Sequence, residues 1–347
     1  MAKPIMIIGG GLAGLTLGIA LRQRGVPVTL CEAGSYPRHR VCGEFICGNG
    51  EAVLERLGLL ARCLQAGAVY ARTAMFICGA HRSPVRPLAR PALCLSRHAL
   101  DALLAQAFQE SGGELRVNDR QPLTGEREGL VQASGRRPNL AEASPRWFGV
   151  KAHVSGRCAV PLAADLEMHL SPHGYIGVNR IGGDEVNVCG LFRASERSRR
   201  PESKPDWLRG GEGSLLNERL GSAEFDPESF CSVAGLRLRP ERAAGQTGCR
   251  IGDALTMTPP VTGNGMSMAF ESAELAGEPL AAYSAGRLDW SGARRQIAQR
   301  CDGAFARRLA WARRLQWMMM SPVLQGGLGP WLLRSDGLWR FLFARTR

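Results

Sequence analysis

Ile7-Ile8-Gly9-Gly10-Gly11-Leu12-Ala13-Gly14 is the stretch that decides the fold. It continues a short apolar run typical of a buried parallel strand, and it opens a helix expected over residues 12–24, whose apolar residues recur at helical spacing. A G-x-G-x-x-G pattern between strand and helix predicts a dinucleotide-binding turn. Gly9 permits the tight turn, Gly11 lets a pyrophosphate approach, and Gly14 lets helix and strand pack closely. The helix N-terminus offers free N–H groups to the phosphates.

A second apolar run, residues 27–31, follows the expected helix and ends on Glu32. Glu32 comes eighteen residues after Gly14, close to the spacing of a carboxylate that accepts hydrogen bonds from an adenosine ribose. The alternative is a plain glycine turn with a surface glutamate. The order strand, turn, helix, strand and acid favours the dinucleotide site.

Length and composition bound the class of protein. The 347 residues suffice for one large or two modest domains. The first strand starts almost at Met1, so we expect no signal peptide, and we expect no spanning helix because no run of about eighteen apolar residues occurs. The eleven cysteines include no C-x-x-C pair, so we expect no metal site and a reduced, cytoplasmic setting.

The net charge of +13 comes mainly from arginine. One interpretation is a partner that carries phosphates, either nucleic acid or an anionic membrane. The other is an arginine-rich composition together with a phosphate-bearing cofactor. The arginines are dispersed and no aromatic-basic motif accompanies them, so we expect no nucleic-acid partner.

The loop after Glu32, residues 33–50, is rich in glycine, proline and arginine. Arg38 and Arg40 are placed to reach back over a cofactor and pair with phosphate oxygens, which suit the guanidinium fork. The alternative for each is a solvated loop charge.

The middle of the chain changes in character. Helices are expected over residues 51–65 and from the N-cap Ser96 to Gly112. Four later runs partly alternate and contain aromatic and β-branched residues, which indicates antiparallel strands of a second layer. These runs cover residues 147–154, 166–170, 174–178 and 185–192.

A second strand–turn–helix unit spans residues 248–284. Asp253 follows the strand, where it suits a hydroxyl of a cofactor's sugar or polyol chain; a turn-capping aspartate is the alternative. The turn Pro260-Val261-Thr262-Gly263-Asn264-Gly265-Met266 leads into the helix, whose N-terminus can hold an anionic or electron-rich group.

This set of motifs resembles the FAD-dependent superfamily of para-hydroxybenzoate hydroxylase and the geranylgeranyl reductases. It comprises Gly9–Gly14, Glu32, Arg40-Val41-Cys42-Gly43-Glu44, Ser96-Arg97 with Leu100-Asp101, Gly252-Asp253, and the turn that starts at Pro260. The resemblance covers most of residues 1–285. It implies an α/β fold in which a Rossmann-type FAD-binding domain of the glutathione-reductase-2 kind carries an inserted antiparallel-sheet domain.

The domain limits follow from this resemblance. The FAD-binding domain is expected over residues 1–70, 94–140 and 240–288, the substrate-binding sheet domain over 71–93 and 141–239, and a helical C-terminal region over 289–347.

The resemblance also assigns cofactor contacts. Gly9, Gly11, Ala13 and Gly14 would hold the FAD pyrophosphate and Glu32 the adenosine ribose. Arg97 would lie beside the phosphates, where the loop position of Arg40 also points, and Asp253 would bind the ribityl chain. Gly263, Gly265 and Met266 would present backbone N–H groups to the flavin pyrimidine edge, where they stabilise negative charge. Gly43, with Cys42 and Glu44, would lie along the isoalloxazine ring.

The sequence also departs from the family. Relatives commonly carry Asp-Gly where this chain has Ser134-Gly135, and that aspartate is associated with NAD(P)H use. The Tyr-x-Trp-x-Phe-Pro signature of many geranylgeranyl reductases is missing, and Gly174-Tyr175-Ile176-Gly177 stands in the comparable place.

Five of the seven tryptophans fall after residue 289, among leucines, methionines and arginines. Residues 304–319 and 329–347 have the pattern of basic amphipathic helices. Such helices suit a membrane interface, and packing on the flavin domain is the alternative. A hydrophobic lid over an apolar substrate channel satisfies both interpretations.

Three functions fit these residues. A monooxygenase would use NAD(P)H and O₂ to hydroxylate or epoxidise a bulky hydrophobic or aromatic substrate of polyketide or isoprenoid kind, free or carrier-bound. A reductase would saturate C=C bonds of an isoprenoid or polyene, and it needs a proton donor. Cys42 and Glu44 are the candidate catalytic residues, with His39 as a third donor. A non-enzymatic nucleotide-binding protein is the remote alternative. We favour the monooxygenase, because the reductase signature around Tyr175 is degraded.

Overall fold

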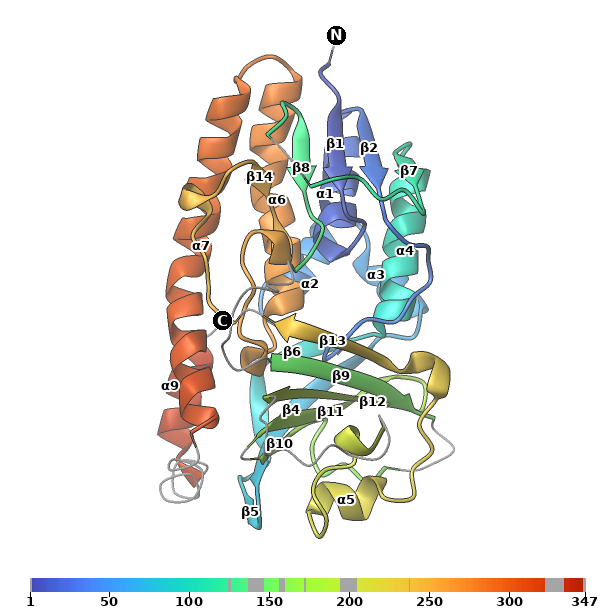
Figure 1. The fold of residues 1–347 in the computed structure, drawn as a ribbon, viewed down its shortest axis with the longest axis vertical. Helices are drawn as coiled ribbons and strands as arrows, with labels where there is room; N and C mark the ends of the chain where they lie inside the picture. Colours follow the sequence, from blue (N-terminus) through green and yellow to red (C-terminus); the bar gives the residue numbers. More distant parts are fainter. Residues whose placement is uncertain are drawn as a thin grey trace.

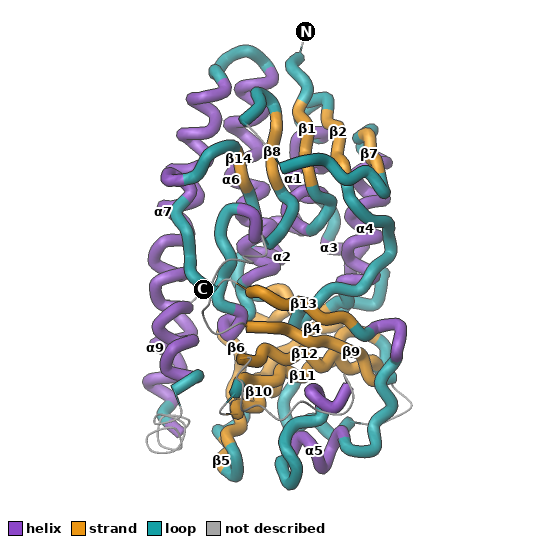
Figure 2. The backbone as a smooth tube through the Cα atoms, viewed as in Figure 1, coloured by secondary structure: helices purple, strands orange, loops and turns teal. Residues whose placement is uncertain are grey.

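The computed structural model describes residues 2–123, 126–136, 147–155, 160–171, 173–193, 205–236, 238–321 and 334–345. Two β-sheets lie one above the other, with helices around the upper sheet and along one side of the molecule (Figure 1). Figure 2 shows the strands as two separate groups, with loops passing between them. The described chain is therefore an α/β structure with two layers of sheet.

The first sheet is parallel and carries the glycine turn. Its strand order is β14-β8-β1-β2-β7, and all neighbouring pairs are parallel. Its strands are β1 (Ile5–Ile8), β2 (Val28–Cys31), β7 (Glu114–Arg116), β8 (Leu130–Gln132) and β14 (Cys249–Arg250). Ile8 lies opposite both Cys31 and Gln132, so three strands end together at the turn that follows Ile8.

Several helices pack with this sheet into the main core, and three of them position the site. They are α1 (Leu12–Arg22), α4 (Arg97–Glu110) and α6 (Gly265–Ser284). The helix α1 contacts both α4 and α6. Gly18 of α1 makes room for the ring of Phe108, because a Cβ at Gly18 would lie 2.7 Å from it. The predicted N-cap Ser96 is confirmed, since its side chain accepts a hydrogen bond from the N–H of Ala99.

The second sheet has the strand order β13-β9-β12-β11-β10-β4-β6-β3, with β5 paired to β4. Neighbours are antiparallel except β10 and β4, which are parallel. The strands are β3 (Phe45–Ile46), β4 (Val69–Cys78), β5 (His81–Arg82), β6 (Arg86–Cys94), β9 (Trp147–Val154), β10 (Leu166–Ser171), β11 (Gly174–Gly182), β12 (Glu185–Arg193) and β13 (Cys231–Leu236). The four strands expected from alternation are present at these positions.

Alternation on β9 separates the two faces of this sheet. Val150, Ala152 and Val154 join a small core with the leucines of α5 (Leu215–Leu220). Because side chains of a strand alternate between faces, Lys151 and His153 point to the other face, toward the loop that follows β2.

Three helix predictions needed correction. The helix expected over residues 51–65 is two helices, α2 (Gly50–Arg56) and α3 (Leu60–Gln65). Gly58 between them has a φ of 73°, and this left-handed conformation is a common way to end a helix. The expected helix 304–319 is the second half of α7 (Trp290–Met319). The last, α9 (Asp336–Arg345), begins after a break at residue 335 inside its predicted range, of which residues 329–333 and 346–347 lie outside the described residues.

The helix α7 runs along one side of the molecule, past both sheets, and α9 lies beside its end (Figure 1). Its N-cap is Asp289, whose side chain accepts from the N–H of Gly292. Among the described residues no helix is both long and apolar enough to cross a membrane.

Candidate functional site

A cavity of about 960 Å³ lies where the two sheets face each other. Its lining comes from the glycine turn, the loop after β2, strands of the second sheet, the start of α6 and the ends of α7 and α9. Small-molecule sites span roughly 300–1,000 Å³. This cavity is therefore large enough for a long ligand that reaches from one sheet to the other.

Two helix N-termini open into this cavity without a protein cap. Gly11 precedes α1 and Asn264 precedes α6; neither gives a side-chain cap, and neither helix has an acid in its first turn. At Gly11 and Gly265 no heavy atom lies within 4 Å of where a Cβ would be. The free N–H groups of both helix ends therefore face open space, and they favour negative charge on a ligand.

Glu32 is held as a carboxylate at the end of β2. It is buried, and it accepts hydrogen bonds from the N–H of Gly10 (2.7 Å), the N–H of Gly34 (3.0 Å) and the guanidinium of Arg38 (2.5 Å). Burial alone would raise the pKa, but the Arg38 hydrogen bond and charge, with the two backbone N–H groups, lower the pKa of Glu32 to about 2. Glu32 also lines the cavity, where an ionised oxygen can accept from ribose hydroxyls.

The two loop arginines have different partners. Arg38, expected to pair with phosphate, instead forms an ion pair with Glu32. Arg40 lines the cavity, and it forms no ion pair within the described part of the chain. Arg40 is exposed, and the loss of water on its protein side together with the charge of Arg38 lowers its pKa. An anion in the cavity would offset this unfavourable charge, so Arg40 fits a phosphate contact.

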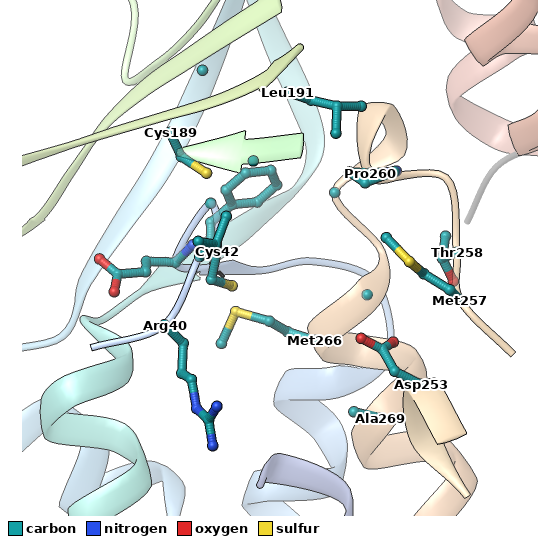
Figure 3. A pocket seen from close by; sticks show the side chains of 18 of the residues that line it. Arg40, Cys42, Cys189, Leu191, Asp253, Met257, Thr258, Pro260, Met266 and Ala269 are labelled. Carbon is teal, nitrogen blue, oxygen red and sulfur yellow. Dashed lines mark hydrogen bonds between the residues drawn. The ribbon is translucent and has the colours of Figure 1, made fainter. Parts of the chain in front are cut away.

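Ser134 and Asp253 also line the cavity. The Ser134 hydroxyl is buried and has no hydrogen-bond partner among the described residues. Asp253 follows β14, and its carboxylate lies 3.9 Å from the Arg136 guanidinium. Its side chain is 38% exposed and faces the cavity (Figure 3). Partial burial raises the pKa of Asp253. Both side chains are thus placed to bond a polar ligand.

Cys42 and Met266 are directed into the same space from opposite walls, as Figure 3 shows. Next to them, Gly43 and Gly263 both make room for the ring of Phe45. A Cβ at Gly43 would lie 2.8 Å from that ring, and a Cβ at Gly263 would lie 2.3 Å from it. These glycines therefore fit the Phe45 ring as well as the flavin contact expected of them, which stays a prediction.

Glu44 lines the cavity and its side chain is fully buried; its expected place along the ring of the cofactor stays a prediction. One oxygen accepts from the N–H of Arg97 (2.9 Å) and lies 3.2 Å from Nζ of Lys151; the other lies 2.7 Å from Nε2 of His153. Its φ is 56°, a left-handed conformation that costs about 1 kcal/mol or more in a residue with a side chain. Burial opposes ionisation of Glu44, but the His153 hydrogen bond and the Lys151 charge lower its pKa.

These contacts define a cluster of three buried side chains, Glu44, Lys151 and His153, with the half-buried His39. Nζ of Lys151 lies 3.2 Å from Nδ1 of His39, so His39 accepts through Nδ1 and carries its proton on Nε2. Neither Lys151 nor His153 was singled out from the sequence, because nothing near β9 forms a motif. The one available signal was the alternation of residues 147–154, which sets these two side chains together on one face.

Arg97 makes a bidentate ion pair with Asp101, at 2.7 and 2.9 Å. The side chain of Asp101 is completely buried and that of Arg97 nearly so. Arg97 also lines the cavity, so its predicted place beside the phosphates is compatible with this pairing.

Stability should fall on acidification in two steps. Burial and the nearby Lys151 charge lower the pKa of His39 from 6.5 to about 4. The unfolded chain then binds a proton before the folded chain does, so the free energy of unfolding decreases as the pH falls from about 6.5 to 4. Glu44 and Glu32, whose pKa values are lowered, contribute stability above about pH 4.5 that is lost below it.

Urea denaturation at several pH values checks this prediction. His39→Asn keeps an acceptor for Lys151 and removes the titrating ring. We expect this variant to lose the decrease in the free energy of unfolding between pH 6.5 and 4, and to keep the decrease below pH 4.5. An unchanged upper step in this variant would exclude His39 as its source.

The half of the cavity away from the glycine turn is apolar. Its lining comes from the second sheet and from the ends of α7 and α9, and it includes Phe76, Leu88, Met168, Leu170, Tyr175, Leu191, Leu315, Met319, Trp339 and Leu342. The C-terminal helices thus form one wall of this half, as expected of a lid. The membrane contact expected of the same tail stays a prediction.

Comparisons with known proteins agree with this arrangement. Residues 2–137 match the family described as FAD binding domain. YetM of Bacillus subtilis, provisionally named an FAD-dependent monooxygenase, is 43% identical over 65 residues, or 19% of this chain and 18% of that protein. The menaquinone reductase of Mycolicibacterium smegmatis is 25% identical over an alignment that covers 96% of this chain and 88% of that protein.

Among solved structures, the flavin-dependent brominase Bmp2 superposes with a TM-score of 0.78 at 19% identity. The match covers 100% of this chain and 93% of Bmp2. At this identity the likeness concerns the fold. The chain spans 18% of YetM but most of the menaquinone reductase, so the relatives' activities do not transfer directly.

Proposed function

We propose that this chain, whose residues 2–137 match the FAD binding domain family and whose fold is that of the flavin-dependent brominase Bmp2, is an FAD-dependent monooxygenase. In the proposed reaction one atom of O₂ enters a bulky apolar or aromatic substrate and the other leaves as water. NAD(P)H supplies the two electrons. Bound FAD supplies the chemistry of oxygen activation.

The residues of the chain would hold FAD along the cavity. The N-terminus of α1 would hold the pyrophosphate, Glu32 would bind the ribose, and Asp253 would bind the ribityl chain. The N-terminus of α6 would lie at the pyrimidine edge, where its N–H groups would stabilise negative charge. The fit rests on three features of the described chain: two uncapped helix ends, Arg40 without an ion pair, and the unbonded Ser134 hydroxyl.

One observation carries the choice of reaction: the candidate acids are poor proton donors at neutral pH. Glu44 is held ionised by His153 and Lys151, and the lowered pKa of His39 keeps that ring neutral. Burial raises the pKa of the Cys42 thiol. A reductase that saturates a C=C bond needs a proton donor for the second carbon. A monooxygenase needs little acid–base catalysis from side chains, because the flavin carries the chemistry. The apolar half of the cavity keeps water from the reacting groups.

The test uses the FAD-loaded protein with NADPH, ¹⁸O₂ and a panel of long-chain aromatic and polyene compounds. We expect a product whose mass increases by one ¹⁸O atom, formed only when O₂ is present. The matched arm uses dithionite-reduced protein without O₂. A product that gains two hydrogens and forms equally well in that arm would overturn the monooxygenase and establish the reductase.

A further inference from the structure

Arg86 is a buried cation in the apolar half of the cavity. It lies on β6, its side chain is 7% exposed, and it lines the cavity together with Phe76, Leu88 and Trp339. Arginine is almost never buried to this extent without partners. We therefore asked which groups compensate the buried charge of Arg86.

The contacts of Arg86 leave one of its nitrogens unused. Nε donates to Asp336 of α9 at 2.7 Å, and the guanidinium lies 5.6 Å from the centre of the Trp339 ring. The terminal nitrogen Nη2 is buried and has no hydrogen-bond partner among the described residues. A buried donor left unsatisfied destabilises the folded protein, and a charged donor does so more than a neutral one. A ligand oxygen in the cavity would remove that cost.

The position of Arg86 sets the length of such a ligand. On β4, Ala74 lies opposite Arg86 and Val69 lies opposite Cys94. Cys94 in turn pairs with Phe45, whose ring contacts Gly43 and Gly263. Five residues of strand separate Val69 from Ala74, which corresponds to about 17 Å. Arg86 is therefore remote from the place where the flavin ring is expected.

We propose that Arg86 binds an anionic or carbonyl oxygen at the far end of an elongated, otherwise apolar substrate. The side chains that line this half of the cavity are mostly apolar, with Asn179 as an exception, so Arg86 fixes the orientation and depth of the substrate rather than taking part in the chemistry. A charge-assisted hydrogen bond in an apolar setting discriminates strongly against a compound that lacks the oxygen. This inference rests on the proposed function for its account of the reacting end.

A purely structural role is the competing explanation. In that case Arg86 only ties α9 to the second sheet through Asp336. The two roles separate because Asp336→Asn removes the ion pair and keeps the guanidinium, whereas Arg86→Met removes both and keeps an apolar side chain of similar length.

Binding to the oxidised, FAD-loaded protein tests the proposal without turnover. The probes are dodecanoate and 1-dodecanol, which differ only at the polar end, and isothermal calorimetry gives both affinities. The wild type should bind dodecanoate at least about tenfold more tightly than dodecanol, the effect of one charge-assisted hydrogen bond. Arg86→Met should abolish that preference and leave dodecanol binding within about twofold, whereas Asp336→Asn should keep the preference.

Two results would overturn the proposal. One is a wild type that binds the acid and the alcohol equally. The other is a loss of affinity for both probes that is the same in Arg86→Met as in Asp336→Asn, which would show that Arg86 only holds α9 in place. Neither result depends on O₂ or on a product, so a failure here is distinct from a failure of the monooxygenase assignment.

Discussion

Gly11→Ala should abolish tight FAD binding and leave the protein folded. The Gly11 backbone has φ −88° and ψ −171°, which alanine adopts without strain, and apart from Gly11 and the two residues next to it in the chain, no heavy atom of the described residues lies within 4 Å of the new Cβ. The methyl group would enter the space where the pyrophosphate meets the N-terminus of α1. We expect FAD affinity to fall about 100-fold, or about 3 kcal/mol, through loss of hydrogen bonds to a charged group.

Gly303→Ala is the matched control for this variant. Gly303 lies in α7 and is likewise free of neighbours within 4 Å of a Cβ, but it is far along the chain from the turn. It should keep FAD affinity and gain up to about 1 kcal/mol of stability from helix propensity. Fluorescence titration of the apoprotein measures the affinities, and thermal melting of the apoprotein measures stability. Retention of FAD by Gly11→Ala would rule out a pyrophosphate at this helix end.

Lys151→Met should destabilise the protein strongly. The side chains of Lys151 and Glu44 are both completely buried and lie 3.2 Å apart. Removal of the cation leaves the Glu44 carboxylate with His153 and a backbone N–H. Loss of one partner of a buried ion pair typically costs about 3–5 kcal/mol. Urea denaturation of the apoprotein at pH 7 gives the change in the free energy of unfolding.

The double variant Lys151→Met/Glu44→Gln distinguishes the ion pair from simple packing. It removes the charge that the single variant leaves without its cation, so it should recover about half of the lost stability or more. Additive losses from the two substitutions would contradict a direct coupling. Because the cluster joins the loop after β2 to β9, we also expect weaker FAD retention in the single variant.

The first half of the cofactor site was predictable because its parts are close in sequence. The glycine turn and Glu32 follow consecutive strands, and the parallel pairing of β1 with β2 brings them together. The strands of the second sheet were predictable for a similar reason, since alternation is a local signal. These patterns needed no knowledge of tertiary contacts.

The rest of the site depends on long-range contacts that local patterns do not encode. Glu44 and Lys151 are separated by more than a hundred residues, and only the tertiary fold, which brings the segment before β3 against β9, makes them an ion pair. The sequence does not distinguish Arg86 from the other arginines of this basic chain. Only the structure shows that its side chain is buried against α9. The break at Gly58 depended on a left-handed backbone conformation that glycine permits but does not require.

The most direct test of the account is a titration of the apoprotein with FAD and with FMN. FMN carries the flavin but lacks the adenosine and the second phosphate that Gly11 and Glu32 are placed to hold. We expect one FAD per chain, bound about 100-fold more tightly than FMN, and we expect Gly11→Ala to remove most of that preference. Equal affinity for the two flavins, or binding of neither, would contradict a cavity that holds FAD along its whole length.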